Sequence, residues 1–386
     1  MDEELLLEND ALIQAAEEYA HYVRIQRLKA VFVIIMLIPT IWLFAHAFRL
    51  DQPAAEPAHV PPAASEKVIL PVFEEDVLLC SSTAKMEYDK EISIETACQS
   101  GDPYRPFLFE YRLRDQSGKF ILDESPDFTA PREYIMPASE THITVDNLKV
   151  NTTYYYKVIV EGQEYPGSFH TARSTRYVTI PGLFNTRDIG GYTTLDGKTI
   201  KQGLLIRGIE LDGLEEPTYY IPQDELENVQ KEFGFAFDMD LRGSGVYYGE
   251  YVSRLGIPHQ FFGAPQYGQI FAASYQESLR QIFAALADPN KYPMYMHCTY
   301  GTDRTGTIVF LLQGVLNVSQ EDMVLEYCRT SYAAGYALNG RKMDVIINMM
   351  SRYSGDTLQE QIVTYLTEVI GVTPQQIASI RNIYLE

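Results

Sequence analysis

The sequence predicts three parts in order along the chain: one transmembrane helix, an all-β sandwich, and an α/β domain with a central sheet flanked by helices. Three observations predict this class. A charge-free apolar segment lies near the N-terminus, short strand-like segments fill the middle, and strands alternate with longer helical patterns in the C-terminal half. The 386 residues leave room for two or three domains, and 46% hydrophobic residues suffice for a sizeable core.

The candidate membrane span is residues 30–48. These 19 residues between Lys29 and Arg49 contain no Asp, Glu, Lys or Arg, and a helix needs about 20 predominantly apolar residues to cross a bilayer. More basic residues crowd the upstream end than the downstream end, so the positive-inside rule places the N-terminus in the cytoplasm and the C-terminal mass outside. Residues 1–29 are expected to form an N-terminal cytoplasmic helix.

An alternative interpretation of the same segment is a cleaved export signal. Ala45–His46–Ala47 has the small-x-small pattern of a signal-peptidase site, although 29 residues make a long leader before the apolar run. Cleavage after Ala47 would secrete the protein, whereas an uncleaved segment would anchor it as a single-pass membrane protein. Residues 49–66 are rich in proline and alanine and predict an extended linker.

Residues 67–173 predict the sandwich. Short strand-like segments alternate there with turn-rich joints, such as the one at 162–167. The predicted strands lie in segments 68–73, 76–82, 91–98, 107–113, 142–148, 153–162 and 168–172.

One corner of this region resembles a known family. Leu148–Tyr154 reads LKVNTTY, which resembles the Leu-x-Pro-x-Thr-x-Tyr corner of fibronectin type III domains, with Val150 in place of the usual proline. The resemblance covers this corner only, and it implies a fibronectin III-like spacer or recognition module. Cys80 and Cys98 lie on two predicted strands, where a disulfide and two buried free thiols agree equally well with the sequence.

Residues 175–386 predict the α/β domain. Several of its predicted helices begin at capping residues such as Ser319 and Thr373. The predicted strands are LLIRG at 204–208, FAFDMDL at 235–241, PHQFFGA at 258–264 and YPMYMHC at 292–298, and the predicted helices are 223–233, 274–287, 304–316, 319–330, 338–351, 358–369 and 374–385.

The main chemical signal follows the last predicted strand, which ends at Cys298 and leads through a tight loop into an apolar helix. A strand, a loop and a helix N-terminus make an anion site, because successive backbone N–H groups and the helix dipole converge on one point. A cysteine at the start of the loop feels the same field, which favours the thiolate and supplies a nucleophile. Arg304, six positions later, can close the loop with a bidentate fork on two phosphate oxygens.

This arrangement is the Cys-x5-Arg-Thr signature of protein tyrosine phosphatases. In its longer form HCxxGxDRTG, residues 297–306 resemble the bacterial tyrosine phosphatase family related to secreted mycobacterial phosphatase B. Cys298 is then the expected nucleophile, and His297 is expected to support the loop by hydrogen bonds. The hydroxyl of Thr305 is placed to stabilise the sulfur as a leaving group. The residues expected to bind the substrate phosphate are Thr299, Tyr300, Gly301, Thr302 and Thr305.

Two further segments extend the resemblance to about residues 175–335. Asn185–Tyr192 resembles the NFRDLGGY segment of that family, and Asp240–Arg242 resembles its DLR motif. The second motif comes at the carboxyl end of a predicted strand, where open α/β sheets place their ligand crevice.

Three residues of these segments are expected to support the site. Arg187 is expected to pair with Asp188 and so brace the catalytic loop. Arg242 belongs to the DLR motif. The pair Gly190–Gly191 predicts a backbone conformation that other residues do not adopt.

The implied reaction needs a general acid for the leaving oxygen and then a base that activates water. Asp303, inside the loop, is the first candidate, because the loop resembles that of myotubularin lipid phosphatases, which share the form Cys-x-x-Gly-x-Asp-Arg-Thr. Asp240 is the second candidate, as the aspartate of the DLR motif. No metal and no cofactor are expected.

The charge of the chain bears on the substrate. Family members commonly carry lysine where this chain has Thr302, and a lysine would offer a second positive charge to a polyphosphorylated inositol ring. Residues 175–386 hold 16 Lys plus Arg against 24 Asp plus Glu, which disfavours an anionic membrane surface. The net charge of −21 for the whole chain disfavours nucleic acid.

The sequence therefore predicts a cysteine-dependent phosphomonoesterase, foremost a protein tyrosine or dual-specificity phosphatase that acts on a phosphorylated protein or peptide through a phosphocysteine intermediate. Two alternatives stay open. One is a phosphoinositide or inositol phosphate phosphatase with the same residues, and the other is a catalytically weak phosphate-binding module.

Overall fold

The computed structural model describes residues 68–73, 107–113, 116–173, 175–215, 220–243, 252–330 and 342–386. The predicted N-terminal helix, the membrane span and the linker lie outside these residues, as do Cys80 and Cys98. Within the described ranges, no helix is long and apolar enough to cross a membrane.

Every described element up to residue 170 is a strand. One sheet has four strands in the order β5-β4-β7-β8, and two further pairs are β1-β3 and β2-β6, all of them antiparallel. The bounds are β1 Val68–Ile69, β2 Phe107–Glu110, β3 Arg112–Leu113, β4 Gly118–Asp123, β5 Arg132–Met136, β6 His142–Val145, β7 Thr153–Val160 and β8 Gln163–His170.

Two strands and one joint differ from the prediction. Strands β4 and β5 were not expected, and β5 lies at a sheet edge with Ile135 largely exposed, so no strong hydrophobic pattern marks it. The predicted joint at 162–167 is almost wholly part of β8. Pro166 is compatible with that strand because β8 is also an edge, where the missing N–H of proline interrupts no central ladder.

Aromatic rings fill the core of this β-rich part. The ring of Phe109 lies 4.4 Å from that of Phe120 and 5.1 Å from that of Tyr156, measured between centroids. Phe107 and Phe169 stack at 4.6 Å. Strands β2, β4, β7 and β8 supply these rings from their buried faces, so these aromatic side chains serve packing.

The corner at Leu148–Tyr154 closes by one hydrogen bond. The backbone N–H of Lys149 donates to the hydroxyl of Tyr154 over 2.8 Å, the geometry in which a tyrosine near the start of a strand bonds back to the chain upstream. Burial raises the pKa of Tyr154 to about 12.

The second part is an α/β domain around a five-stranded sheet in the order β12-β11-β13-β10-β9, parallel except for β9. All four predicted strands of this domain are present. The strand bounds are β9 Arg187–Asp188, β10 Leu205–Gly208, β11 Phe237–Asp240, β12 His259–Phe261 and β13 Met294–His297.

The described helices confirm the predicted helical segments, except that 338–341 lie outside the described residues. The side chains of Ser319 and Thr373 cap α6 and α10 as expected. The bounds are α3 Gln223–Phe233, α4 Gln276–Leu286, α5 Asp303–Val315, α6 Gln320–Cys328, α8 Asp344–Met350, α9 Leu358–Tyr365 and α10 Pro374–Tyr384, with 3₁₀ turns η3 Tyr267–Phe271, η4 Ala273–Tyr275 and η5 Pro289–Lys291 and a π-helical turn η7 Leu366–Ile370.

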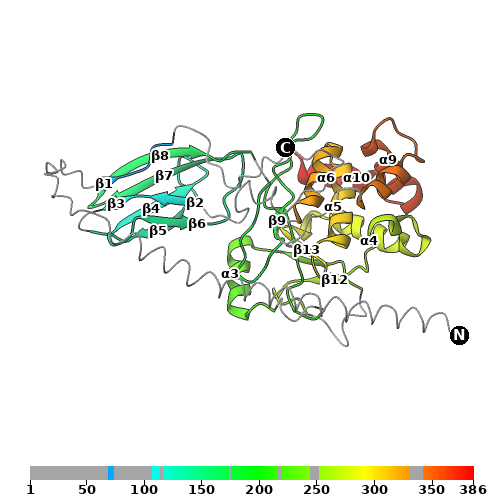
Figure 1. Ribbon diagram of the computed structural model, residues 1–386, viewed down its shortest axis with the longest axis horizontal. Helices are drawn as coiled ribbons and strands as arrows, with labels where there is room; N and C mark the ends of the chain where they lie inside the picture. Colours follow the sequence, from blue (N-terminus) through cyan, green and yellow to red (C-terminus); the bar gives the residue numbers. More distant parts are fainter. Residues whose placement is uncertain are drawn as a thin grey trace, which may run out of the picture. The chain divides into compact units, whose positions relative to one another are not determined.

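The sheet separates two apolar cores. Met294 and Met296 of β13 pack with α4, α5, α6, α9 and α10, whereas Tyr295, between them in sequence, packs with α3 on the other face. Figure 1 shows the same division, with the yellow-to-red helices on one side of the sheet and the green α3 on the other. The alternation of side chains along β13 thus places this strand at the centre of three layers.

The registers bring three strand ends to one edge of the sheet. Gly208 of β10 and Asp240 of β11 each lie opposite His297, the last residue of β13. The loop after β13 therefore begins where an open parallel sheet leaves room for a ligand.

We expect Tyr154→Phe to lower the free energy of unfolding by about 1 kcal/mol, because the N–H of Lys149 loses its acceptor at a largely buried position. Urea unfolding of the full chain measures this loss. The matched control is Tyr155→Phe on the opposite face of β7. Equal stability of the two variants would contradict the role given to the corner.

Candidate active site

The loop between β13 and α5 holds the predicted nucleophile. Cys298 follows the last residue of β13 and is 3% exposed, while α5 begins five positions later at Asp303. Thr299 and Thr302 are also buried, whereas Tyr300 is about half exposed at the rim. The strand, loop and helix predicted from the sequence are therefore present in the expected order.

Three consecutive carbonyl groups of the loop accept hydrogen bonds from chain segments outside it. The N–H of Glu210 donates to the carbonyl of Thr299 over 3.1 Å. The side-chain amide of Asn185 donates to the carbonyl of Tyr300 over 2.9 Å, and the guanidinium of Arg207 donates to that of Gly301.

These bonds decide where the amides of the loop point. In a trans peptide the N–H is directed opposite to the carbonyl of the same unit. Since the carbonyls of residues 299–301 face outward to their donors, the N–H groups of residues 300–302 face the opposite side. Gly301 makes the turn possible, because its φ is +65° and a Cβ there would lie 2.4 Å from the carbonyl oxygen of Gly208.

Arg304, the arginine expected to bind phosphate, lies over this loop. Its Nη2 donates to the hydroxyl of Thr299 over 2.9 Å and lies 3.5 Å from a carboxylate oxygen of Glu215. Its side chain is 28% exposed, so the guanidinium can be reached from solvent. Arginine and loop amides together can bind the oxygens of a phosphate.

The predicted pair between Arg187 and Asp188 is wrong. The two residues are consecutive on β9, so their side chains point to opposite faces of the strand. Arg187 instead donates to the carboxylate of Glu326 over 2.7 Å, and Asp188 pairs with Arg176 at 2.6 Å. Gly191, in the same segment, has the predicted left-handed conformation with φ +87°.

Arg187 and Arg207 share the carboxylate of Glu326 behind the loop. Arg207 Nη1 lies 2.8 Å from one of its oxygens, and all three side chains are almost fully buried. Burial alone would raise the pKa of Glu326, but the two arginines hold it below its ordinary value. Two positive charges against one negative charge leave a positive excess that favours an anion in the loop.

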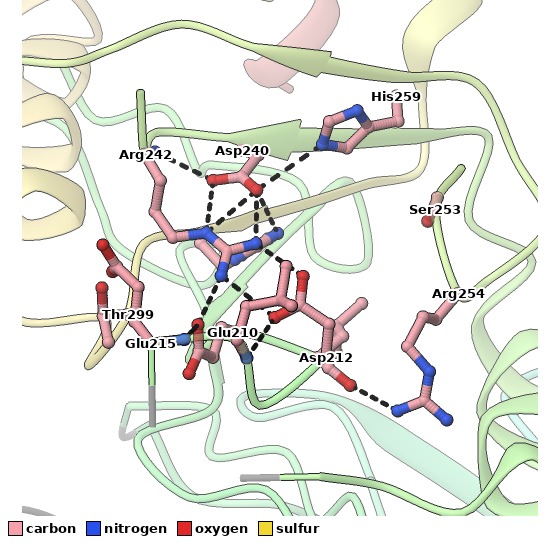
Figure 2. A network of polar contacts seen from close by, with 12 residues as sticks. Glu210, Asp212, Glu215, Asp240, Arg242, Ser253, Arg254, His259 and Thr299 are labelled. Atoms are coloured by element: carbon pink, nitrogen blue, oxygen red, sulfur yellow. Dashed lines mark hydrogen bonds and ion pairs between the residues drawn. The ribbon is translucent and has the colours of Figure 1, made fainter. Parts of the chain in front are cut away.

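Arg242 joins three carboxylates at the neighbouring strand ends. Its guanidinium lies 2.7 Å from Asp240 and 2.8 Å from Asp212, and it also contacts Glu210. Figure 2 shows this guanidinium between Asp240 on one side and Glu210 and Asp212 on the other. Residues 240 and 242 are two apart on an extended chain, which places both side chains on one face.

Asp240, the second candidate for the general acid, does not fit that role. Burial would raise the pKa of its carboxyl, but His297, His259 and Arg242 together hold it well below the usual value. Arg242 donates to both oxygens of this fully buried carboxylate, so neither oxygen is placed to give a proton to a substrate. Asp240 is therefore a structural partner of Arg242 and of His297.

His297 supports the loop from the strand, as predicted. Its Nε2 lies 3.0 Å from Asp238, and its Nδ1 lies 3.3 Å from the carbonyl oxygen of Cys298. Burial lowers the pKa of His297, but Asp240 and Asp238 outweigh this and raise it to about 9. The imidazole is therefore protonated at neutral pH, directly beside the nucleophile.

Asp303 is placed at the N-terminus of α5 with its carboxylate partly exposed. The hydroxyl of Tyr267 donates to Asp303 Oδ1, and Lys342 Nζ lies 3.9 Å from the same oxygen. The hydroxyl of Thr305 is buried and has no hydrogen-bond partner among the described residues. Both residues thus lie at the loop, as the sequence predicted.

An α/β sheet that carries a buried cysteine, outward-facing loop carbonyls and an arginine over the loop defines a hydrolase of phosphate monoesters. The chain belongs to the tyrosine phosphatase family: the model of that family matches residues 178–245 and 259–386, which make up just over half of the chain. No curated protein matches the chain.

Solved structures give weaker likenesses. The core catalytic domain of the PP-IP phosphatase SIW14 from S. cerevisiae, in complex with citrate, is 16% identical with a TM-score of 0.27, over 40% of this chain and 88% of that one. Tk-PTP in its active form is 18% identical with a TM-score of 0.25, over 38% of this chain and 92% of that one. At these TM-scores the likenesses add no argument.

Sequence reasoning missed the groups that hold the loop from a distance. Arg207 had a signal, since it is a charged residue inside the apolar strand LLIRG. Asn185 opened a recognised segment without a stated role. Glu326, Glu210 and Tyr267 carried no signal, because their roles depend on contacts between remote parts of the chain.

The raised pKa of His297 makes stability depend on pH. The folded-state pKa of about 9 exceeds the ordinary 6.5, so the stabilisation is complete below pH 6.5 and is lost as pH rises through about 9. We expect wild type to lose on the order of 2 kcal/mol more than His297→Gln between pH 6 and 9.5. Urea unfolding at both pH values measures the difference. Identical losses in the two proteins would show that His297 is not the group responsible.

Proposed function

We propose that the chain is a cysteine-dependent phosphomonoesterase, foremost a protein tyrosine or dual-specificity phosphatase. One observation carries the proposal: the loop that runs from Cys298 to Arg304 turns three carbonyls outward and so directs its amides to the opposite side. This is the arrangement that a phosphate dianion beside a sulfur nucleophile requires. The net positive charge of the Arg187–Glu326–Arg207 cluster supports it.

The reaction proceeds in two steps. The Cys298 thiolate attacks phosphorus, a sulfur–phosphorus bond forms, and the bond to the leaving oxygen breaks while Asp303 gives that oxygen a proton. Asp303 then accepts a proton from water, whose oxygen attacks phosphorus, and the phosphate leaves the sulfur. Arg304 and the loop amides bind the equatorial oxygens in both steps.

The substrate that we propose is a phosphotyrosine residue of a protein or peptide. Cys298 is buried below a rim that includes the half-exposed Tyr300, and a long aryl phosphate can reach such a depth. Thr302 also lacks the second positive charge that a polyphosphate would use.

A second candidate is an inositol phosphate or phosphoinositide. Lys342 supports it, because its ammonium group lies 3.9 Å from Asp303 and supplies a cation at the loop from a remote part of the chain. The third candidate, a catalytically weak phosphate-binding module, would use the same loop without turnover.

Two finer assignments rest on motifs. Residues 297–306 support a place in the branch related to secreted mycobacterial phosphatase B. The hydrogen bond from Lys149 to Tyr154 supports a fibronectin III-like corner in the β-rich part, which we propose to be a spacer or recognition module.

The test is phosphate release by the full-length protein in detergent with EDTA, on phosphotyrosine and phosphoserine peptides and on inositol phosphates. We expect Cys298→Ser to lower turnover by about 10³-fold or more, because the nucleophile is lost. Ranking the substrates by kcat/KM separates the first two candidates.

The matched control is Cys328→Ser, which changes a cysteine that is equally buried but lies on α6. It should retain most of the turnover. Activity that survives Cys298→Ser would contradict the mechanism. A folded wild-type protein that binds phosphate but turns over no substrate would support the binding module.

We also propose that residues 30–48 anchor the chain, with the N-terminus in the cytoplasm, unless cleavage after Ala47 releases it. The apolar, charge-free composition of the segment supports this. The full chain should stay with membranes after an alkaline carbonate wash, and deletion of 30–48 should release it. Protease added outside intact cells should reach the C-terminal part. Full release of the uncleaved wild type by carbonate would refute the anchor.

A further inference from the structure

Tyr267, the first residue of η3, has an unusual backbone. Its φ is +49°, in the left-handed region that non-glycine residues seldom adopt. Such a conformation costs free energy and persists only where surrounding contacts hold it.

Two hydrogen bonds attach Tyr267 to the catalytic helix α5. Its backbone N–H donates to the hydroxyl of Thr307 over 2.9 Å, and its own hydroxyl donates to Asp303 Oδ1. Thr307 lies one helical turn after Asp303, so both bonds fall on the same face of α5. The two bonds thus hold both the left-handed backbone and the phenol group of Tyr267 against α5.

A second tyrosine lies behind the first. The hydroxyl of Tyr327 on α6 lies 2.7 Å from that of Tyr267. Since the single proton of the Tyr267 hydroxyl goes to Asp303, Tyr327 donates to Tyr267. Burial, together with Asp303 and Tyr327, raises the pKa of Tyr267 far above its ordinary value, so the hydroxyl remains a donor at all working pH values.

The contacts also distinguish the two oxygens of Asp303. Tyr267 donates to Oδ1, and Lys342 Nζ lies 3.9 Å from the same Oδ1. A proton on Oδ1 would meet a donor and a positive charge. The proton of the acid form is therefore better carried by Oδ2.

We infer that Tyr267 is a positioning residue that fixes the carboxyl group of Asp303 and leaves Oδ2 to deliver the proton to the leaving oxygen. The inference rests on the proposed function, in which Asp303 is the general acid. It assigns a role in this reaction to a residue far from the loop in sequence.

The test uses leaving groups of different acidity. A general acid matters most for a poor leaving group and little for a good one. We expect Tyr267→Phe to lower kcat/KM about ten-fold for phenyl phosphate, the value of one buried hydrogen bond, and less than about two-fold for p-nitrophenyl phosphate. Asp303→Asn should show the same pattern with a larger loss. Activity on p-nitrophenyl phosphate also reports that the variant is folded.

The matched control is Tyr365→Phe. Its hydroxyl donates to the carbonyl of Ile270 in the same turn η3, over 2.5 Å, and Tyr365 is buried. Any loss that it causes should be equal for both substrates, because it does not contact the acid. If Tyr267→Phe does not fold, Tyr327→Phe decides, since it weakens the donor chain and should give a smaller loss that again depends on the leaving group.

The outcomes separate this inference from the proposed function. Equal losses for both substrates in Tyr267→Phe, while Asp303→Asn depends on the leaving group, would overturn the role of Tyr267 alone. No leaving-group dependence in Asp303→Asn would overturn the inference together with the assignment of the acid. Turnover that persists in Cys298→Ser would remove the proposed mechanism itself.

Discussion

The site depends on one constraint: the carbonyl groups of the loop after β13 need donors outside the loop. A loop that curls around an anion directs its N–H groups inward, and its carbonyls must then be satisfied on the outer side at a buried position. The donors are Asn185, Arg207 and the N–H of Glu210. They come from β10 and from the segments on either side of it, so the pairing of β10 with β13 is itself a condition for the loop.

A side chain among these donors brings a charge that needs its own partner. Arg207 is fully buried, and an unpaired buried guanidinium would be costly. The carboxylate of Glu326 on α6 forms ion pairs with both Arg207 and Arg187. Burial and Arg187 lower the pKa of Arg207 to about 10, against the opposing effects of Glu326 and Cys298. Helix α6 is therefore held by ion pairs to Arg207, which bonds the loop after β13.

The sequence allowed prediction of what is local. Periodicity and caps such as Ser319 indicated the helices, apolar runs indicated the buried strands, and the contiguous loop placed Cys298, Asp303 and Arg304 together. Pairings across the fold were not predictable: Arg187 was matched with its neighbour Asp188, yet its partner Glu326 lies 139 positions away. Likewise, the position of Asp240 at a strand end suggested a catalytic role, whereas its carboxylate accepts hydrogen bonds from Arg242. Strand β5 was not predicted because it lies at a sheet edge and most of its side chains are exposed or half-buried. Strand β4 was missed although its side chains alternate between buried and more exposed positions.

The outward carbonyls of the loop also have a consequence for how the chain folds. Asn185 and Tyr300 are 115 positions apart, and Arg207 and Gly301 are 94 apart. The loop after β13 therefore takes its shape only after these distant segments have come together. Contacts between residues so far apart in the sequence form slowly during folding. Until then, the side chain of Cys298 is not yet buried and is exposed to oxidation on a nascent chain. The completed fold thus protects the cysteine, whereas its unfolded precursors do not.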